Sequence, residues 1–237
     1  MYYDANGNPH VEEHAPVALG SCMVKVYWWM TFALAVSGLC AWVVGTSPAL
    51  TEALVENDGV FILLVLAEIG MVLGISAGIS KLSAATASAL FILYSALNGI
   101  TLSVVLLIYT GSSVVQVFGI TAATFAVMAT VGTVTRRDLS GLGNMLFMAL
   151  VGLIIASVVN MFLASEALYW ICSYAGVLIF VGLTAYDAQK IKQAFYAAEG
   201  SGDPETIGRI AVLGALELYL DFVNLFLYLL RFMGKRR

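Results

Sequence analysis

Four acidic side chains lie within or at the edge of long apolar runs. Glu68, Glu217 and Asp221 fall inside such runs, and Asp187 falls at the end of another. No lysine or arginine lies inside these runs to neutralise the acids. A carboxylate in an apolar interior is costly unless it is protonated, paired or bound to a cation. These residue types in this setting therefore predict the carriage of protons or cations.

The final apolar run carries a polar stripe on one helical face. Glu217, Asp221, Asn224 and Tyr228 stand at positions i, i+4, i+7 and i+11, which at 100° per residue form a narrow row. Leucine, valine and phenylalanine occupy the other faces. Such a helix must turn its stripe toward protein or a water-filled cavity, so we expect it to be central. Asp221 lies mid-span, and Glu217 lies near the span boundary in a supporting position.

The lengths of the apolar runs identify the elements that position these acids. A helix needs about 20 residues to cross a bilayer core of ~30 Å. Uncharged or nearly uncharged runs cover 26–45, 60–80, 82–135, 139–165, 167–186 and 210–230. The third run is long enough for two spans, and the turn at 109–113 divides it. The fold class predicted is therefore an all-α integral membrane protein, a bundle of seven transmembrane helices with the seventh in the centre.

Composition agrees with this class. Of the 237 residues, 61% are hydrophobic and only 11% are charged, against about 25% charged in a soluble domain. The net charge of −4 argues against nucleic acid as a partner. We expect a polar N-terminal tail over 1–24, a membrane domain over 25–233 and a short basic tail over 234–237.

The basic residues predict the orientation and leave one conflict. Seven of the eleven lie at one side if the N-terminus is cytoplasmic: Lys25, Lys81, Arg136, Arg137, Lys190, Lys192 and Arg209. By the positive-inside rule the N-terminus is therefore expected in the cytoplasm. The other four, Arg231, Lys235, Arg236 and Arg237, follow the seventh span. Either that helix crosses against the rule, or it turns back and returns the basic tail to the cytoplasm.

Structural explanations compete with functional ones for several residues. Glu68 could serve as a hydrogen-bonding link between helices, and Asp187 could simply pair with Lys190 at i+3. Gly70, Gly74 and Gly78 form a GxxxGxxxG face on the second span. We expect that face to pack closely against another helix.

Two segments carry a family resemblance. Residues 184–191 read TAYDAQKI, and residues 218–226 read LYLDFVNLF, followed by LLRF at 229–232. In this order, and with an acid in the second span, they resemble the Bax inhibitor-1 family (transmembrane BAX inhibitor motif proteins). The resemblance covers nearly the whole chain. It implies a seven-helix bundle whose seventh helix is surrounded by the other six, and a pH-sensitive calcium leak channel in a bacterial inner membrane.

The resemblance also implies roles for residues. Asp187 and Asp221 match the family's two aspartates, which share a proton and switch the pore between closed and open forms. Glu68 matches the acid on helix two that lines the path, to which Glu217 and Asn224 add polar groups. Calcium, as the transported ion, would be held by Asp187, Asp221 and Glu68. The family's helix-two arginine has no clean counterpart, so Lys81 and Lys190 are the candidate closing partners.

Elementary electrostatics fits these roles. Two carboxylates a few ångström apart cannot both ionise cheaply, so the pair holds one proton and titrates as a unit. The boundaries above put Asp187 at the membrane edge and Asp221 eleven residues, about 16 Å, deeper. The two can meet only if helix six extends inward or helix seven starts below the membrane, and we expect some of both.

Other functions are weighed against the channel. An intramembrane aspartyl protease also uses a Tyr-Asp pair, as at Tyr186-Asp187, but its second motif, Gly-x-Gly-Asp, is replaced here by Leu218-Tyr219-Leu220-Asp221. A secondary transporter or a non-conducting membrane scaffold that binds other membrane proteins is a further alternative. We expect no enzymatic activity and no cofactor. The expected partners are the lipid bilayer and calcium ions.

Overall fold

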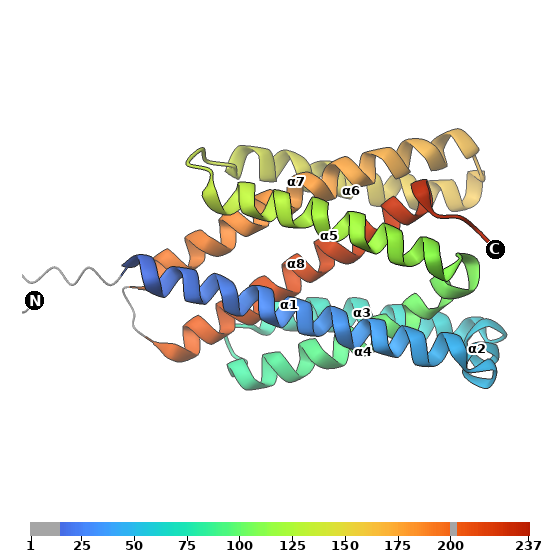
Figure 1. Cartoon of the computed structure of the whole chain (residues 1–237), viewed down its shortest axis with the longest axis horizontal. Helices are drawn as coiled ribbons and strands as arrows, with labels where there is room; N and C mark the ends of the chain where they lie inside the picture. Colours follow the sequence, from blue (N-terminus) through green and yellow to red (C-terminus); the bar gives the residue numbers. More distant parts are fainter. Residues whose placement is uncertain (1–14, 200–202) are drawn as a thin grey trace, which may run out of the picture.

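The structure, a computed structural model, describes residues 15–199 and 203–237. Within them the chain forms eight helices and no named strand (Figure 1): α1 (Ala15–Thr46), α2 (Pro48–Val55), α3 (Asp58–Gly78), α4 (Ala84–Ile108), α5 (Gly111–Val134), α6 (Ser140–Leu163), α7 (Glu166–Glu199) and α8 (Pro204–Met233). All except α2 are long and apolar enough to cross a membrane. The predicted all-α bundle with seven spans is confirmed, and the turn between the third and fourth spans falls at 109–110, as expected.

The long helices run between two ends of the bundle (Figure 1). We call the end at which α1 begins the proximal end and the end at which α1 finishes the distal end. The last helix crosses fully, because α8 is continuous from Pro204 to Met233 and residues 234–237 lie at the distal end. There the backbone N–H groups of Thr110 and Arg237 donate to the carbonyl oxygens of Lys235 and Ile108, each at 3.0 Å. The basic tail is thus tied to the α4–α5 connection and does not turn back.

Several helices are longer than their uncharged runs. α1 begins at Ala15, within the segment expected as a tail, whereas residues 1–14 lie outside the described part of the chain. α7 continues to Glu199 and α8 already begins at Pro204. Asp203 caps α8 by accepting hydrogen bonds from the backbone N–H groups of Glu205 and Thr206. Both conditions under which Asp187 and Asp221 could meet are therefore fulfilled.

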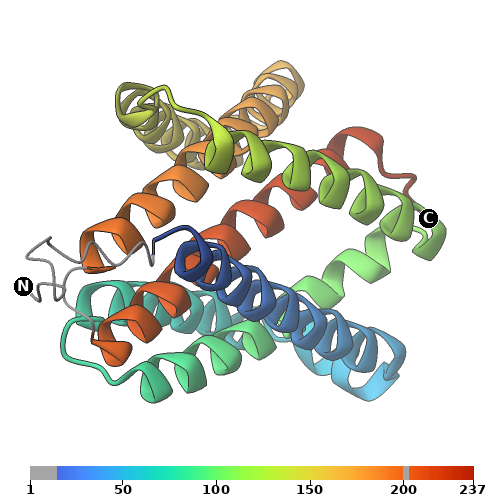
Figure 2. The ribbon, with the colours of Figure 1, turned by 60° about the vertical axis from the view of Figure 1, so that its left-hand side comes forward.

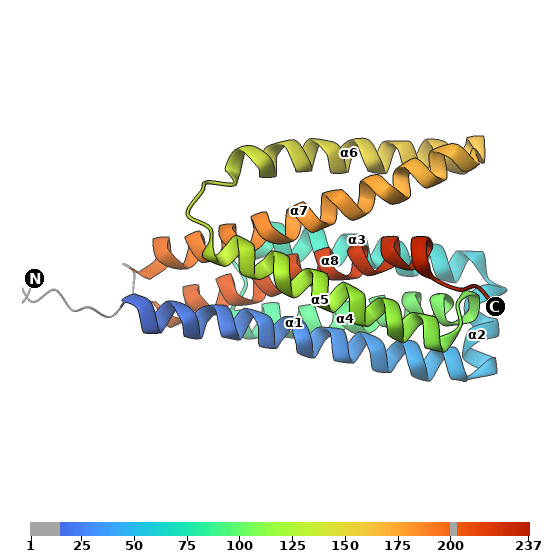
Figure 3. The same ribbon diagram turned by 45° about the horizontal axis from the view of Figure 1, so that its top comes forward.

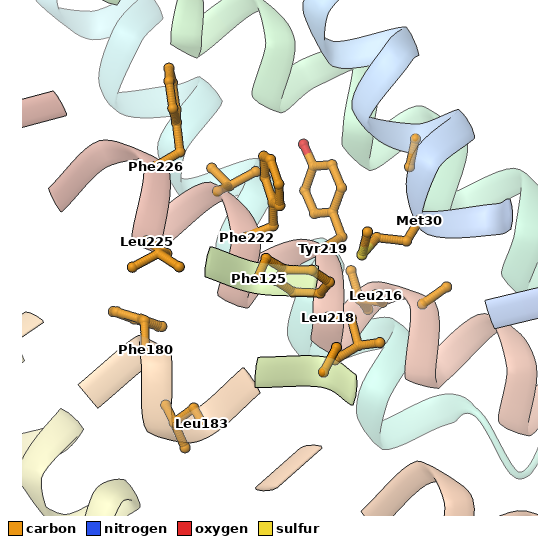
Figure 4. Close-up of a cluster of buried hydrophobic side chains, with 14 of the residues drawn as sticks. Met30, Phe125, Phe180, Leu183, Leu216, Leu218, Tyr219, Phe222, Leu225 and Phe226 are labelled. Carbon is orange, nitrogen blue, oxygen red and sulfur yellow. The ribbon is translucent and has the colours of Figure 1, made fainter. Parts of the chain in front are cut away.

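α8 is the centre of the bundle (Figure 2). It packs mainly against α1, α4, α5 and α7, while α3 packs on α4 and α6 packs on α7 (Figure 3). Its apolar faces carry Phe222 and Leu225, which lie with Phe125 of α5 and Phe180 of α7 in one buried cluster (Figure 4). Of the six other spans that were expected to surround the last one, four pack closely against it, whereas α3 and α6 form an outer layer. α6 still reaches α8 through the hydrogen bond between Ser157 and Tyr228.

The glycine face on α3 does not pack as expected. A Cβ atom on Gly70 or Gly74 would meet nothing within 4 Å. Close approaches occur at other glycines, for example between α5 and α7, where a Cβ on Gly132 would collide with the backbone of Ala185. The prediction of close packing at the GxxxGxxxG face was wrong within this chain, because α3 lies at the rim of the bundle and meets α4 with other residues.

Candidate functional site: an acidic cavity between α6, α7 and α8

A cavity of about 480 Å³ lies between α6, α7 and α8. Its polar lining comes from three helices: Asn144 of α6, Asp187 and Lys190 of α7, and Glu217, Asp221, Asn224 and Tyr228 of α8. The polar stripe of α8 therefore faces a cavity, as its spacing predicts. α6 closes the opposite wall with apolar residues such as Phe147 and Leu150.

Asp187 and Asp221 meet in this cavity. Their side chains are hydrogen-bonded to each other. Because an ionised carboxylate has no donor, this bond requires a proton on one of the two groups. Asp221 is only 4% exposed, and its Oδ2 atom has no hydrogen-bond partner. A buried oxygen without a partner is costly and is a natural place for a ligand.

Lys190 is the base beside the acids. Its Nζ atom lies 2.7 Å from Glu217 Oε1 and 3.9 Å from Asp187 Oδ1. The expected i, i+3 contact with Asp187 exists, but the shorter bond joins α7 to α8 through Glu217. About half of the Lys190 side chain is exposed, so this bond lies at the rim of the cavity. Asn224 instead bonds within its own helix, donating from Nδ2 to the Leu220 carbonyl oxygen at 2.8 Å.

Residues next to Asp187 fix the position of α7. Gln189 accepts a hydrogen bond from the Leu139 backbone N–H and donates to the Arg137 carbonyl oxygen, both at 2.8 Å. Lys192 Nζ donates to the Thr133 carbonyl oxygen near the end of α5, where a cation also complements the helix dipole. A Cβ on Gly143 of α6 would overlap the Tyr186 ring. The TAYDAQKI segment thus positions Asp187 mainly by binding the connection from α5 to α6.

Glu68 lies outside this cavity. It accepts hydrogen bonds from Asn98 Nδ2 at 3.1 Å and from the Thr101 hydroxyl, both on α4. The Asn98 side-chain oxygen in turn accepts from the Tyr219 hydroxyl at 2.9 Å, and that hydroxyl lies 2.7 Å from Ser37 Oγ. A polar network therefore links α3, α4, α8 and α1, as the structural explanation of Glu68 anticipates.

The three residues named as calcium ligands do not share one site. Tyr219 and Asp221 are two residues apart on α8, so they point about 200° apart, and the Glu68 network ends on the face opposite the aspartates. In the part of the chain that the structure describes, no group of three or more His, Cys, Asp or Glu side chains is arranged to hold a metal ion. Lys81 lies in the α3–α4 connection, and Lys190 is the candidate closing partner that meets the acids.

Sequence reasoning missed the middle of this network. Asn98 and Tyr219 are 9% and 0% exposed. One signal was available for Asn98, because Asn98 and Thr101 are polar residues at i, i+3 in a run without charge. The sequence gives no such signal for Tyr219, since a tyrosine among leucines is typical of an apolar core.

The chain also matches known proteins. The profile of a family described as "Inhibitor of apoptosis-promoting Bax1" matches residues 19–237. The chain belongs to the Bax inhibitor-1 family. The inner membrane protein YbhL of Escherichia coli (strain K12) is 48% identical over 219 residues, which cover 92% of this chain and 93% of that protein.

Two further relatives come from other bacteria. An uncharacterised protein of Borreliella burgdorferi is 45% identical over 215 residues, covering 91% of this chain and 92% of its own length. One from Rickettsia prowazekii is 40% identical over 215 residues, covering 91% and 89%. Family membership and the seven apolar helices make this chain an integral membrane protein. The family description and the name of the E. coli relative include no enzymatic activity.

Proposed function

We propose that this protein is a pH-sensitive calcium leak channel of the bacterial inner membrane, with Asp187 and Asp221 as its gate. The observation that carries the proposal is the unpartnered Oδ2 atom of Asp221, buried mid-helix in a cavity that three carboxylates line. Carboxylate oxygens are the ligands that calcium prefers. The proposal includes a cytoplasmic N-terminus, since seven of the eleven basic residues lie at the proximal end.

The gate would work through the shared proton. While one carboxyl is protonated, the hydrogen bond between Asp187 and Asp221 ties α7 to α8. Loss of the proton places two negative charges side by side in a region of low dielectric, where their repulsion is strong. The two helices then part, and the freed oxygens face the cavity. The network from Glu68 to Tyr219 holds the opposite face of α8 during this movement.

Lys190 would act as the closing partner. Its ammonium group bridges Glu217 and Asp187 in the closed arrangement, which offsets part of the negative charge at the rim. When the aspartate pair separates, Lys190 and Asp187 move together with α7 while Glu217 stays on α8. The contact between Lys190 and Glu217 is therefore weakened. Calcium then competes with Lys190 for the same carboxylates.

Calcium flux into proteoliposomes, measured from pH 5 to pH 8, tests the proposal. Wild-type flux is expected to rise with pH, because the closed form is the protonated one. Asp187→Asn and Asp221→Asn each replace one of the two carboxyl groups that share the proton, so the flux of either variant should be nearly independent of pH. Lys190→Met should raise the flux at low pH, since it removes the bridge at the rim.

Asp138→Asn is the matched control. Asp138 lies in the connection between α5 and α6, outside the spans, and hydrogen bonds from Ser140 hold the pKa of Asp138 below its ordinary value. It stays ionised throughout the assay, so its replacement should leave the pH profile unchanged. Absence of flux at every pH would refute the proposal, as would Asn variants that keep the wild-type profile.

The hydrogen-bonded aspartates also favour a second candidate, an intramembrane aspartyl protease, because such enzymes use two neighbouring aspartates. Incubation of the reconstituted protein with a membrane-spanning substrate distinguishes the two. Cleavage that both Asn variants abolish would support the protease. A scaffold would show neither flux nor cleavage.

A further inference from the structure

The distal end of the bundle carries basic residues that the proposed cation path does not use. Arg231 stands near the end of α8, and Arg236 lies in the tail bound to the α4–α5 connection. They violate the positive-inside pattern, because they lie opposite the seven basic residues of the proximal end. Among residues 15–199 and 203–237, the ion pairs involve Lys190 and Arg209 and neither of these two arginines.

The two arginines line two adjoining cavities. One has a volume of about 530 Å³ and the other about 620 Å³, and both are lined by Arg231, Arg236, Tyr169 and Asn160. Volumes of this size are typical of ligand-binding pockets. The Arg231 guanidinium lies over the rings of Tyr228 and Tyr169, 5.2 and 5.9 Å from their centroids. The Arg236 side chain is hydrogen-bonded to Tyr109 and Tyr169. Aromatic contacts thus hold both positive charges at the pocket.

The larger cavity has an apolar wall that faces the bilayer. α4 contributes Val105 and Ile108, and α6 contributes Ile154, Val158 and Met161. Three of these stay strongly exposed within the chain, with Ile154 at 56%, Val158 at 50% and Met161 at 79%. α6 packs mainly on α7, and residues of both α4 and α6 line the cavity, which therefore forms a groove between these two helices.

The depth of the site is that of lipid headgroups. Trp170 and Tyr174 lie beside Tyr169 at the start of α7, and Phe232 packs against Tyr174 with ring centroids 5.1 Å apart. Tyrosine and tryptophan gather at the membrane–water interface. The arginines therefore stand at the level of phosphate groups, and the apolar wall runs from them toward the middle of the bilayer.

We propose that this distal groove binds an anionic phospholipid. The phosphate lies between Arg231 and Arg236, and one acyl chain lies along the apolar wall between α4 and α6. Guanidinium groups bind phosphate through paired hydrogen bonds. Among the described residues, Glu166 is the one acid in the lining of these two cavities, so with two arginines the pocket keeps a net positive charge. A soluble anion has no acyl chain to place against the apolar wall. The groove adjoins the acidic cavity, because Ile154 and Tyr228 line both, but Arg231 and Arg236 are not part of the proposed cation path. A bound phospholipid gives a physical reason for the basic residues at this end.

Native mass spectrometry of the full chain in detergent, titrated with phosphatidylglycerol, tests the site. Arg231→Gln combined with Arg236→Gln should weaken phosphatidylglycerol binding by about tenfold or more, because it removes charge-assisted bonds. Arg136→Gln combined with Arg137→Gln is the matched control, since that exposed pair lies at the proximal end. Arg231→Lys combined with Arg236→Lys keeps the charge but loses the paired hydrogen bonds, so it should restore the binding only in part.

A second arm tests the apolar wall without touching the charges. Val158→Trp fills the groove and should reduce phosphatidylglycerol binding, whereas Val159→Trp, the next residue and not part of the cavity wall, should not. Circular dichroism verifies that each variant keeps its helices. Unchanged binding in the double glutamine variant, or equal losses in the paired controls, overturns the proposal. Competition by excess inorganic phosphate also overturns it, because the site would then bind a free anion.

Discussion

Replacing Tyr219 by phenylalanine removes one buried hydroxyl and leaves the aromatic packing in place. The Tyr219 side chain is fully buried, and its ring meets Phe91 and Tyr94 edge-on at centroid distances of 5.6 and 5.8 Å. Phenylalanine preserves both contacts. The hydroxyl binds Ser37 and Asn98, at 2.7 and 2.9 Å. Tyr219→Phe therefore tests the polar network separately from the packing of α8.

The magnitude follows from what each partner loses. Ser37 still donates to the Ser95 carbonyl oxygen at 2.7 Å, so its loss is small. The Asn98 side-chain oxygen loses its donor inside the bundle. A buried group left without a partner costs about 1–3 kcal/mol, and hydrogen bonds between membrane helices contribute up to ~1.7 kcal/mol. We expect the free energy of unfolding to fall by about 1–2 kcal/mol, or about 5- to 30-fold in the folding equilibrium.

Titration with sodium dodecyl sulfate in mixed micelles, followed by circular dichroism, measures this free energy. Tyr94→Phe is the matched control, because among the described residues the Tyr94 hydroxyl makes no hydrogen bond, and its effect should stay within about 0.5 kcal/mol. In an Asn98→Leu background, Tyr219→Phe should cost little, since the acceptor is already gone. A cost below about 0.5 kcal/mol in the wild type, or the same cost in both backgrounds, would refute the reasoning.

Three further predictions concern other parts of the chain. Glu68→Gln should change the free energy of unfolding by less than about 0.5 kcal/mol, because its amide oxygen can accept from Asn98 and its N–H can donate to Thr101, whose hydroxyl then donates to the Leu97 carbonyl oxygen. Glu68→Leu should lower it by about 1–2 kcal/mol; equal effects in the same titration would contradict a linking role. Gly176→Val should destabilise by about 1–3 kcal/mol, because its Cβ would come within 2.6 Å of the Tyr228 ring, whereas Gly152→Val points into open space; thermal unfolding that ranks them otherwise would be inconsistent with the packing. Hydrogen bonds from the first turn of α8 hold the pKa of Asp203 below its ordinary value, so the stabilisation from the ionised cap is complete above about pH 4 and is lost as the pH falls through the lower folded-state pKa. Amide exchange in that turn should therefore be faster in Asp203→Ala than in the wild type at neutral pH, and this difference should shrink in strong acid rather than grow.

Hydropathy along the chain was enough to predict the number and type of the membrane spans, although it did not predict the short helix α2. A bilayer imposes a minimum helix length and excludes charge, so each span appears in the sequence as a run of about 20 apolar residues. The polar stripe of α8 could also be predicted, because Glu217, Asp221 and Asn224 belong to one helix whose period is known. For the same reason the spacing alone predicted that Asp221 faces either protein or a water-filled cavity.

The positions of the helix ends could be predicted less well from the sequence. α7 and α8 continue beyond their apolar runs, since α7 reaches Glu199 and α8 begins at Pro204. Charged residues such as Lys190 and Lys192 are tolerated there because they bond to neighbouring helices. Hydropathy marks where the lipid ends and does not mark where the helix ends.

Contacts between helices were decided only by the tertiary structure. The pairing of Asp187 with Asp221, the choice of Lys190 over Lys81 as the base near them, and the separation of Glu68 depend on how far each helix extends and which way it is turned. A span's composition is the same whichever neighbour it faces, so the open glycine face of α3 could not be foreseen either. Sequence alone determined which residues are too polar for lipid. The packing around α8 decided which of them meet, because residues two apart on that helix face opposite sides of the bundle.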